Sequence, residues 1–238
     1  MILEKIRFHE NLHKVQKIRL LKVVFSPQIR AWEIPAFRGA VIAKTGREHI
    51  LFHNHTENNG FRYSYPLIQY KRIGKQASVL CIKEGVDEIH RFFEQSNWDV
   101  NLNGNKMSMK IEQLDMNQYT MNVWDKTFDY SLMNWIALNS ENYKKYMQLD
   151  VLSNKIEFLE RILTGNILSF AKGIDWHIEK DTTVKILDIK HSNTLSLKRK
   201  KVLGFDLTFR SNVFLPNFIG LGKSVSIGFG TVKQFGNN

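Results

Sequence analysis

The sequence Gly220-Leu221-Gly222-Lys223-Ser224-Val225-Ser226-Ile227-Gly228-Phe229-Gly230 lies near the C-terminal end of the chain. It holds two Gly-x-Gly pairs separated by five residues, among them one lysine and two serines. Because glycine accepts positive φ and lets a ligand approach the backbone, such a loop can present several N–H groups to an anion. Lys223 adds a positive charge, and Ser224 and Ser226 add hydroxyl donors. The segment therefore predicts a loop that binds a phosphate or a phosphodiester backbone.

Two nucleotide-binding motifs are similar to this segment, and neither fits it. Gly222-Lys223-Ser224 matches the end of a P-loop, but the first glycine of that motif would fall on Asn217. The dinucleotide fingerprint would need a glycine at Val225. The apolar residues that follow Ser224 predict a strand, whereas both motifs open a helix. The remaining alternative is a glycine-rich hairpin that only closes a β-sheet.

The charge of the chain favours a polyanionic partner. There are 34 Lys and Arg residues against 23 Asp and Glu residues, a formal net charge of +11, which suits nucleic acid ahead of an anionic membrane surface. The single cysteine, Cys81, excludes a disulfide framework and a cysteine metal site. No stretch reaches the about 18 apolar residues of a membrane span, and the N-terminal residues are too polar for a signal peptide. We therefore expect a cytoplasmic protein with no membrane partner.

The first half of the chain, residues 1–120, has the order of elements of a ferredoxin-like domain. Alternation and helical spacing of apolar residues mark the elements, and Gly74-Lys75-Gln76 marks a hairpin turn. We expect a strand at 17–25, a helix at 29–45, strands at 66–73 and 77–83, a helix at 86–95 and a strand at 106–113. This βαββαβ order is the ferredoxin-like pattern.

The second half, residues 121–238, predicts a modified ferredoxin-like domain. We expect a strand at 128–138, helices at 139–147 and 151–171, strands within 174–189 and 193–209, and a final β-segment that carries the glycine-rich loop. The basic cluster of Lys198, Arg199, Lys200 and Lys201 falls in a turn or on an exposed strand face. The expected fold is thus α+β, with two tandem ferredoxin-like units.

The pair His53 and His55 is the strongest catalytic candidate. Histidine titrates near neutral pH, so two close imidazoles can act as base and acid in one reaction. RNA suits such a pair, because its 2′-OH can attack the adjacent phosphate once the hydroxyl proton is removed and the leaving oxygen is protonated. The extra negative charge could be stabilised by four residues that follow: Arg62, Tyr63, Lys71 and Arg72.

Two other interpretations of the histidine pair stay open. His-x-His on an extended segment can bind Zn or Mn, with Glu57 as the nearest carboxylate. No Asp/Glu cluster of the two-metal nuclease type is present, so we expect neither a metal nor a cofactor. Alternatively, both histidines are polar loop residues without a role in chemistry. The tryptophans are expected in the core rather than as stacking platforms: Trp32, Trp98, Trp124, Trp135 and Trp176.

Three further stretches carry a resemblance to a known family. They are Glu33-Ile-Pro-Ala-Phe-Arg-Gly-Ala-Val-Ile, Leu51-Phe-His-Asn-His and Phe61-Arg-Tyr-Ser-Tyr-Pro-Leu-Ile-Gln-Tyr-Lys-Arg-Ile. Together with the glycine-rich loop, they resemble the type I-B-like branch of the CRISPR-associated endoribonucleases that cut precursor CRISPR RNA within each repeat. The resemblance covers nearly the full chain, and the glycine-rich loop is its most diagnostic part.

The resemblance implies metal-independent cleavage that leaves a 5′-OH and a 2′,3′-cyclic (or 3′-) phosphate. The paired histidines of the branch fall on His53 and His55, and its assisting tyrosine falls on Tyr63, with Tyr65 as the alternative. The glycine-rich loop would bind the backbone of CRISPR repeat RNA. The residues expected to bind RNA are Arg38, Arg62, Lys71, Arg72, Lys198, Arg199, Lys200, Gly220, Gly222, Lys223, Ser224, Gly228 and Gly230.

Two other classes of function remain as alternatives. A non-catalytic RNA-binding subunit of a CRISPR effector complex would have the same folds and charge, but the histidine pair beside Arg62 and Tyr63 favours the nuclease. A metal-dependent phosphohydrolase would be revealed by sensitivity to EDTA. Effector-complex subunits are therefore further candidate partners in a prokaryotic cytoplasm, and the sequence leaves monomer and homodimer open.

Overall fold

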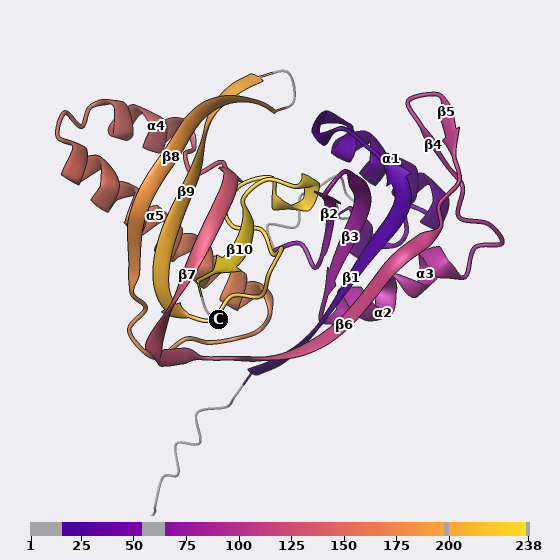
Figure 1. Ribbon diagram of the computed structural model, residues 1–238, viewed down its shortest axis with the longest axis horizontal. Coiled ribbons are helices and arrows are strands. Elements are labelled where there is room, and N and C mark those ends of the chain that lie inside the picture. The colour runs from indigo at the N-terminus through magenta and orange to yellow at the C-terminus, as the bar shows by residue number, and fades with distance from the viewer. Residues whose placement is uncertain (1–15, 54–64, 198–199, 237–238) are drawn as a thin grey trace, which may run out of the picture.

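Two antiparallel four-stranded sheets form the two halves of the protein (Figure 1). The structure is a computed structural model that describes residues 16–53, 65–197 and 200–236. In this part of the chain, no helix is long and apolar enough to cross a membrane. The predicted α+β fold of two tandem ferredoxin-like units is confirmed.

The N-terminal sheet has the strand order β2-β3-β1-β6, which is the order of a ferredoxin-like domain. Its helix α1 follows a 3-10 turn, η1, and ends at Gly46, whose φ of 103° suits only glycine. Phe37 and Val41 of α1 are buried against the sheet. The elements of this half are β1 (Gln16–Gln28), η1 (Ala31–Glu33), α1 (Ile34–Thr45), η2 (Ile50–Phe52), β2 (Ile68–Ile73), β3 (Gln76–Ile82), α2 (Glu84–Glu88), α3 (His90–Phe93), β4 (Val100–Leu102), β5 (Asn105–Met107) and β6 (Ile111–Met121).

The last strand of this sheet differs from the prediction. The closing strand expected at 106–113 is β6, which lies later in the chain, and β5 instead pairs with β4 in a separate hairpin. Asn103 and Gly104 form the turn of that hairpin with φ of 53° and 87°, the geometry that Asn-Gly adopts readily. The helix expected at 86–95 is likewise divided into α2 and α3 at Ile89.

The C-terminal sheet repeats the same topology with one substitution. Its strand order, β10-β7-β9-β8, is again that of a ferredoxin-like domain, but the glycine-rich segment takes the place of the second helix. A strand was expected within residues 174–189, but residues 174–183 form none, and β8 begins at Val184. The elements are β7 (Val123–Trp135), α4 (Ser140–Met147), α5 (Leu152–Gly173), β8 (Val184–Leu197), β9 (Lys200–Val213), η3 (Val225–Ile227) and β10 (Thr231–Phe235).

One of the two hydrophobic clusters of the core is shared by both halves. Leu159, Leu163 and Ile167 form the buried stripe of α5 at helical spacing. The same cluster of buried residues includes Ile18 and Leu80 from the N-terminal sheet. One face of that sheet is therefore covered by the C-terminal half, while α1, α2 and α3 cover the other (Figure 1).

Candidate nucleic-acid interface

The glycine-rich segment is not the strand that its apolar residues predicted. Val225–Ile227 is one 3-10 turn, flanked by Ser224 and Gly228 in the left-handed region with φ of 58° and 92°. Gly222 and Gly230 also have positive φ, of 90° and 61°. Four positive φ values within nine residues are incompatible with an extended strand, so the chain folds into a compact loop instead.

Two of the glycines are required by packing within the protein. A Cβ at Gly222 would lie 2.7 Å from Cδ1 of Trp135, and a Cβ at Gly230 would overlap the carbonyl oxygen of Leu221. The segment is further held by hydrogen bonds from Leu221 N–H to Gly230 O (2.8 Å) and from Lys223 N–H to Ile136 O (3.1 Å). Part of the glycine pattern therefore has a structural cause.

Replacing Gly230 by alanine should therefore destabilise the fold more than the same change at Gly74. Both glycines have a φ of 61°, but nothing lies within 4 Å of a Cβ at Gly74. We expect Gly74→Ala to lower the free energy of unfolding by about 1–2 kcal/mol from the backbone conformation alone. Gly230→Ala should lower it by at least about 2 kcal/mol more, because its Cβ would also overlap the backbone of Leu221. Urea unfolding measures both; equal losses would contradict the packing role of Gly230.

The tip of the segment still offers groups to an anion. Within the described part of the chain, the N–H groups of Ser224, Val225 and Ser226 have no hydrogen-bond partner. Lys223 is exposed beside them. The arrangement therefore retains the donors that phosphate binding needs, although it uses a 3-10 turn rather than a strand to present them.

Tyr65 links the histidine-bearing segment, residues 53–65, to the glycine-rich segment. Its hydroxyl donates to Gly220 O at 2.8 Å, and its ring packs edge-on against Phe170 at 5.1 Å between centroids. Burial raises the pKa of this hydroxyl well above its usual value. Close approach to α5 is possible because Gly173 has no Cβ. Tyr65 therefore links the two segments within the protein.

His53 lies at the other described end of this segment. A side-chain nitrogen of Arg38 donates to the backbone carbonyl of His53, and His53 Nε2 lies 2.7 Å from the carbonyl oxygen of Arg47. A carbonyl only accepts, so Nε2 carries the hydrogen, and the lone pair of the neutral ring is on Nδ1. Burial lowers the pKa of Arg38, whose guanidinium is partly buried and positions the backbone of His53.

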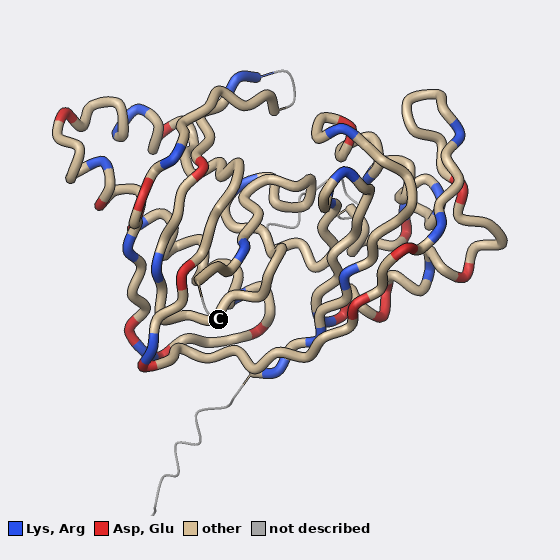
Figure 2. Tube along the Cα trace, viewed as in Figure 1, with Lys and Arg blue, Asp and Glu red and all other residues tan. Residues whose placement is uncertain are grey.

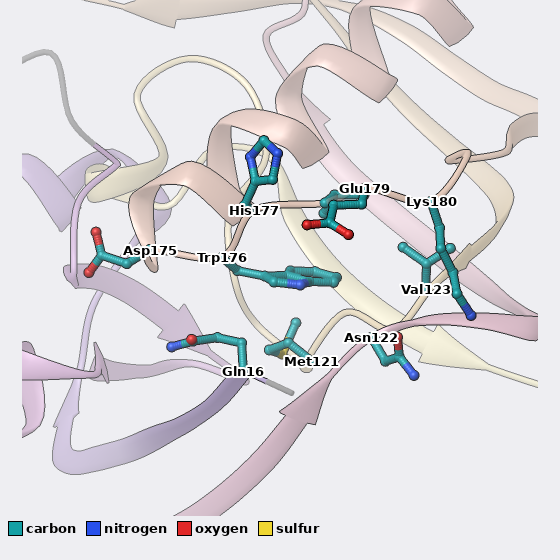
Figure 3. A pocket seen from close by; sticks show the side chains of 10 residues that line it. Gln16, Met121, Asn122, Val123, Asp175, Trp176, His177, Glu179 and Lys180 are labelled. Atoms are coloured by element: carbon teal, nitrogen blue, oxygen red, sulfur yellow. The ribbon is translucent and has the colours of Figure 1, made fainter. Parts of the chain in front are cut away.

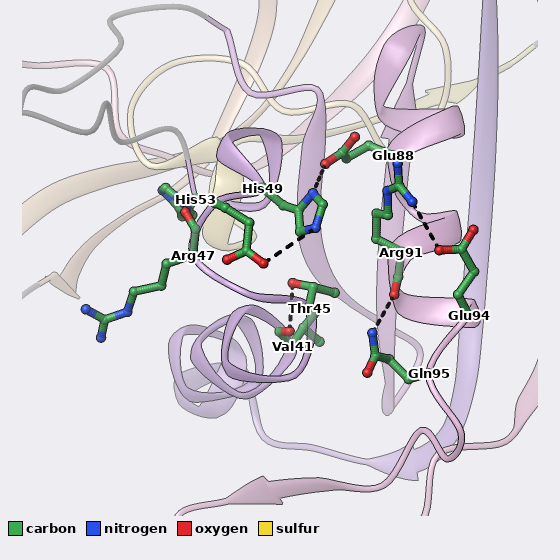
Figure 4. A network of polar contacts seen from close by, with 10 residues as sticks. Val41, Thr45, Arg47, His49, His53, Glu88, Arg91, Glu94 and Gln95 are labelled. Carbon is green, nitrogen blue, oxygen red and sulfur yellow. Dashed lines mark hydrogen bonds and ion pairs between the residues drawn. The ribbon is translucent and has the colours of Figure 1, made fainter.

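The neighbouring His49 belongs to a different network (Figure 4). Its Nδ1 lies 2.8 Å from Oε1 of Glu88 in α2, which attaches η2 to the helical layer. The remaining candidates of this segment, His55, Arg62 and Tyr63, lie outside the described residues, as do Lys198 and Arg199. Lys200 is described and begins β9.

A groove of about 480 Å³ lies beside the glycine-rich segment, between the two halves. Its lining includes the start of α1, the β2–β3 turn, the end of the β8–β9 hairpin, and Gly228. Figure 2 shows Lys and Arg residues near the start of α1 and at the end of this hairpin. The predicted RNA-binding residues Lys71 and Arg72 both line the groove, so the fold brings them to the glycine-rich segment.

Lys71 does not lie on the open surface that its predicted role implied. It is only 2% exposed, and its Nζ lies 3.3 Å from Oγ1 of Thr231, which in turn donates to Gly228 O at 3.1 Å. Burial lowers the pKa of Lys71 to about 7. Arg72 is exposed, and its Nε donates to Ile29 O at 2.7 Å. The two consecutive basic residues therefore have different environments.

Among the described residues, no group of three or more His, Cys, Asp or Glu side chains is arranged to hold a metal ion. The residues of the metal interpretation other than His53, namely His55 and Glu57, lie outside the described part.

A second cavity, of about 230 Å³, lies where β6 meets β7 (Figure 3). Asp175, Glu179 and Lys180 give its wall mixed charge, and it shares no lining residue with the groove.

The tandem ferredoxin-like units with a glycine-rich segment in place of the last helix are similar to solved Cas6 structures, which makes this chain a Cas6-like protein. A crystal structure of Cas6b has a TM-score of 0.82 and 27% identity, covering 92% of this chain and 100% of that one. A crystal structure of the CRISPR RNA processing endoribonuclease Cas6b has a TM-score of 0.69 and 26% identity, with the same coverage. A type IV Cas6 crRNA endonuclease, at 11% identity and a TM-score of 0.58, shares the fold.

Sequence comparison agrees with the structural similarity. The Cas6b N-terminal domain family matches residues 16–120, and the Cas6b C-terminal domain family matches residues 122–235. The chain belongs to the Cas6b family. An uncharacterised protein of Methanocaldococcus jannaschii is 42% identical over 98 residues, which are 41% of this chain and 65% of that relative. The resemblance seen in the sequence is confirmed at the level of the family.

Proposed function

We propose that this protein cleaves precursor CRISPR RNA within its repeats without a metal ion. The observation that carries the proposal is the match of both halves to the two Cas6b domains, which leaves little of the chain unaccounted for. The formal net charge of +11 supports an RNA substrate. In this proposal, residues 1–120 and 121–238 are two domains that bind one RNA between them.

The proposed chemistry is attack of a 2′-OH on the adjacent phosphate. His53 and His55 would act as base and acid, and Tyr63 would assist, to leave a 5′-OH fragment and a 2′,3′-cyclic (or 3′-) phosphate. The described part supports this at His53, because the Nε2 contact with Arg47 O leaves Nδ1 as the basic nitrogen of the neutral ring. Tyr65 supports Tyr63 as the assisting residue, since its own hydroxyl is buried and bonded to Gly220.

The RNA backbone is proposed to follow the glycine-rich segment. Lys223 and Ser224 offer a charge and donors at its tip. Tyr65, at one described end of the histidine segment, contacts Gly220, and His53, at the other end, is held to α1 by Arg38. Ile34 of the same helix packs against Gly228. The further proposed RNA-binding residues are Arg62, Lys71, Arg72, Lys198, Arg199, Lys200, Gly222 and Gly230.

The experiment that tests this function is cleavage of the cognate repeat RNA in excess EDTA. We expect cleavage of the all-ribose RNA and none of an RNA with a 2′-deoxy nucleotide at the cut position, because the attacking hydroxyl is then missing. Loss of cleavage in EDTA that returns with added metal would favour metal-dependent hydrolysis. Tight binding without cleavage, even with metal, would make the protein an RNA-binding subunit of an effector complex instead.

A further inference from the structure

Trp32 is exposed beside the groove, contrary to the expectation that it lies in the core. Its side chain is 65% exposed, whereas Trp135 is fully buried. Trp32 lies in η1, and this turn is fixed by a hydrogen bond from Arg30 N–H to Glu33 Oε2 at 2.7 Å. The guanidinium of Arg30 lies 5.9 Å from the centroid of the indole ring. An aromatic ring is therefore presented to solvent from a defined turn.

The groove that Trp32 lines combines this ring with positive charge. Lys71, Arg72 and Lys233 also line it, and its described lining includes no Asp or Glu. Its volume of about 480 Å³ is within the usual range for small-molecule sites. An aromatic platform next to cations and without carboxylates is the combination by which proteins bind single-stranded nucleic acid.

Lys71 is an incompletely paired cation at this site. An ammonium has three donors, but within the described residues the hydrogen bond that Lys71 makes through its side chain is the one to Thr231 at 3.3 Å. A buried charge is costly unless it is paired, and a phosphate oxygen would supply the missing charge. The neighbouring Gly228, whose carbonyl accepts the hydrogen bond of Thr231, also lines the groove and packs closely against Ile34.

We propose that this groove is a subsite for an unpaired nucleotide of the RNA, with a base stacked on Trp32 and a phosphate of the same strand bound to Lys71. The inference rests on the proposed function, because it takes the ligand to be repeat RNA. It adds a base-recognition platform in η1 that the basic residues and the glycine-rich segment do not supply. Stacking is tolerant of sequence, so the subsite selects an unpaired base rather than a particular one.

The base-stacking half is tested by combining Trp32→Ala with repeat RNAs that carry one abasic position each. Stacking of one base contributes a roughly 5- to 150-fold increase in affinity. We expect a loss of this size for Trp32→Ala and for wild-type protein with one particular abasic RNA. Combined, the two changes should cost no more than either alone. Trp32→Phe should retain most of the affinity, because a smaller ring still stacks.

Trp124→Ala is the matched control for this measurement. Trp124 is also partly exposed, with Lys126 Nζ 5.8 Å from its ring centroid, but it lies on β7 outside the groove. The Trp124→Ala variant should bind all the RNAs with wild-type affinity. Full affinity of Trp32→Ala for intact RNA, or additive losses at every abasic position, would overturn the stacking role.

The phosphate-binding half is tested with Lys71→Met at about pH 6, where the wild-type ammonium is charged. A charge-assisted hydrogen bond corresponds to a roughly 10- to 150-fold effect on affinity. We expect a loss of that size together with a higher unfolding temperature, which excludes misfolding as the cause. Unchanged affinity would overturn this half. If the stacking test and the phosphate test both fail while repeat RNA is still cleaved, the proposed function stands without this subsite. If wild-type protein binds no RNA, the proposed function and the subsite are both wrong.

Discussion

His53→Ala and His55→Ala should each lower the rate of repeat cleavage by about 10²- to 10⁴-fold, the usual contribution of a general acid or base. The wild-type rate should show a bell-shaped dependence on pH, since one histidine must be neutral and the other protonated. Each variant should lose one limb of the bell. The limb that is lost identifies which histidine is the base and which is the acid.

The control for these variants is His90→Ala. His90 is exposed on α3 and makes no contact with the groove or the glycine-rich segment. Its removal should leave the rate unchanged. Because His53 also contacts Arg47 O, the unfolding temperature of His53→Ala has to be measured alongside. Rates within threefold of wild type in both histidine variants, which is less than about 1 kcal/mol of barrier, would show that the pair is not catalytic.

Lys71→Met should stabilise the free protein by a few kcal/mol near pH 6. Burial lowers the pKa of Lys71 from 10.5 to about 7 in the folded state. Below pH 7 the ammonium is charged in both states, so the folded protein bears the full cost of burying it. Between about pH 7 and 10.5 only the unfolded state holds the proton, so wild-type stability gains relative to the variant as the pH rises. Above this window the lysine is neutral in both states.

The advantage of Lys71→Met should therefore be largest below pH 7 and shrink toward pH 10.5. Urea unfolding at about pH 6, 8 and 10 measures this difference, which can reach roughly 3–5 kcal/mol. Lys75→Met is the matched control, because Lys75 is exposed in the turn between β2 and β3; it should show no such trend. A difference independent of pH, or a variant less stable than wild type at pH 6, would contradict the buried position of Lys71.

The histidine and lysine variants also separate function from folding. For Lys71→Met, the binding and unfolding measurements together predict a free protein that is more stable and a lower affinity for RNA. This is expected where a binding site retains an unfavourable charge because that charge binds the ligand. The histidine variants should change the rate with little effect on affinity. A single set of purified variants, measured for unfolding, binding and cleavage, thus tests the site and the groove independently.

Much of the fold was predictable because its signals are local. The strand around 17–25 and the helices at 29–45 and 151–171 follow from apolar spacing of 2 and 3.6 residues, which the structure confirms as β1, α1 and α5. The strand order could be predicted from the element order, because ferredoxin-like units have short connections of one handedness. The hairpin at Asn103 and Gly104 was also present in the sequence, as an Asn-Gly turn signal that the prediction overlooked.

The candidate site was predictable in its residue types and not in their surroundings. The glycine-rich segment and His53 were recognised from the sequence, but Trp32 was assigned to the core and Val225–Ile227 to a strand. Hydrophobicity favours burial of Trp32, and nothing within η1 shows that no element covers it. The Arg30–Trp32 pair, a cation two residues from an aromatic ring, was the available signal for an exposed platform.

The sequence by itself determined the two ferredoxin-like units, the basic charge and the family, because these depend on local periodicity, composition and motifs. Only the tertiary structure decided the environment of Lys71. In β2, Ile68 and Tyr70 face α1, where Tyr70 packs on Phe37, so alternation predicts that Lys71 faces solvent. That second face is instead covered by Thr231 and the glycine-rich segment, more than 150 residues later in the chain. Burial there is a product of docking between the halves, and no local pattern encodes it.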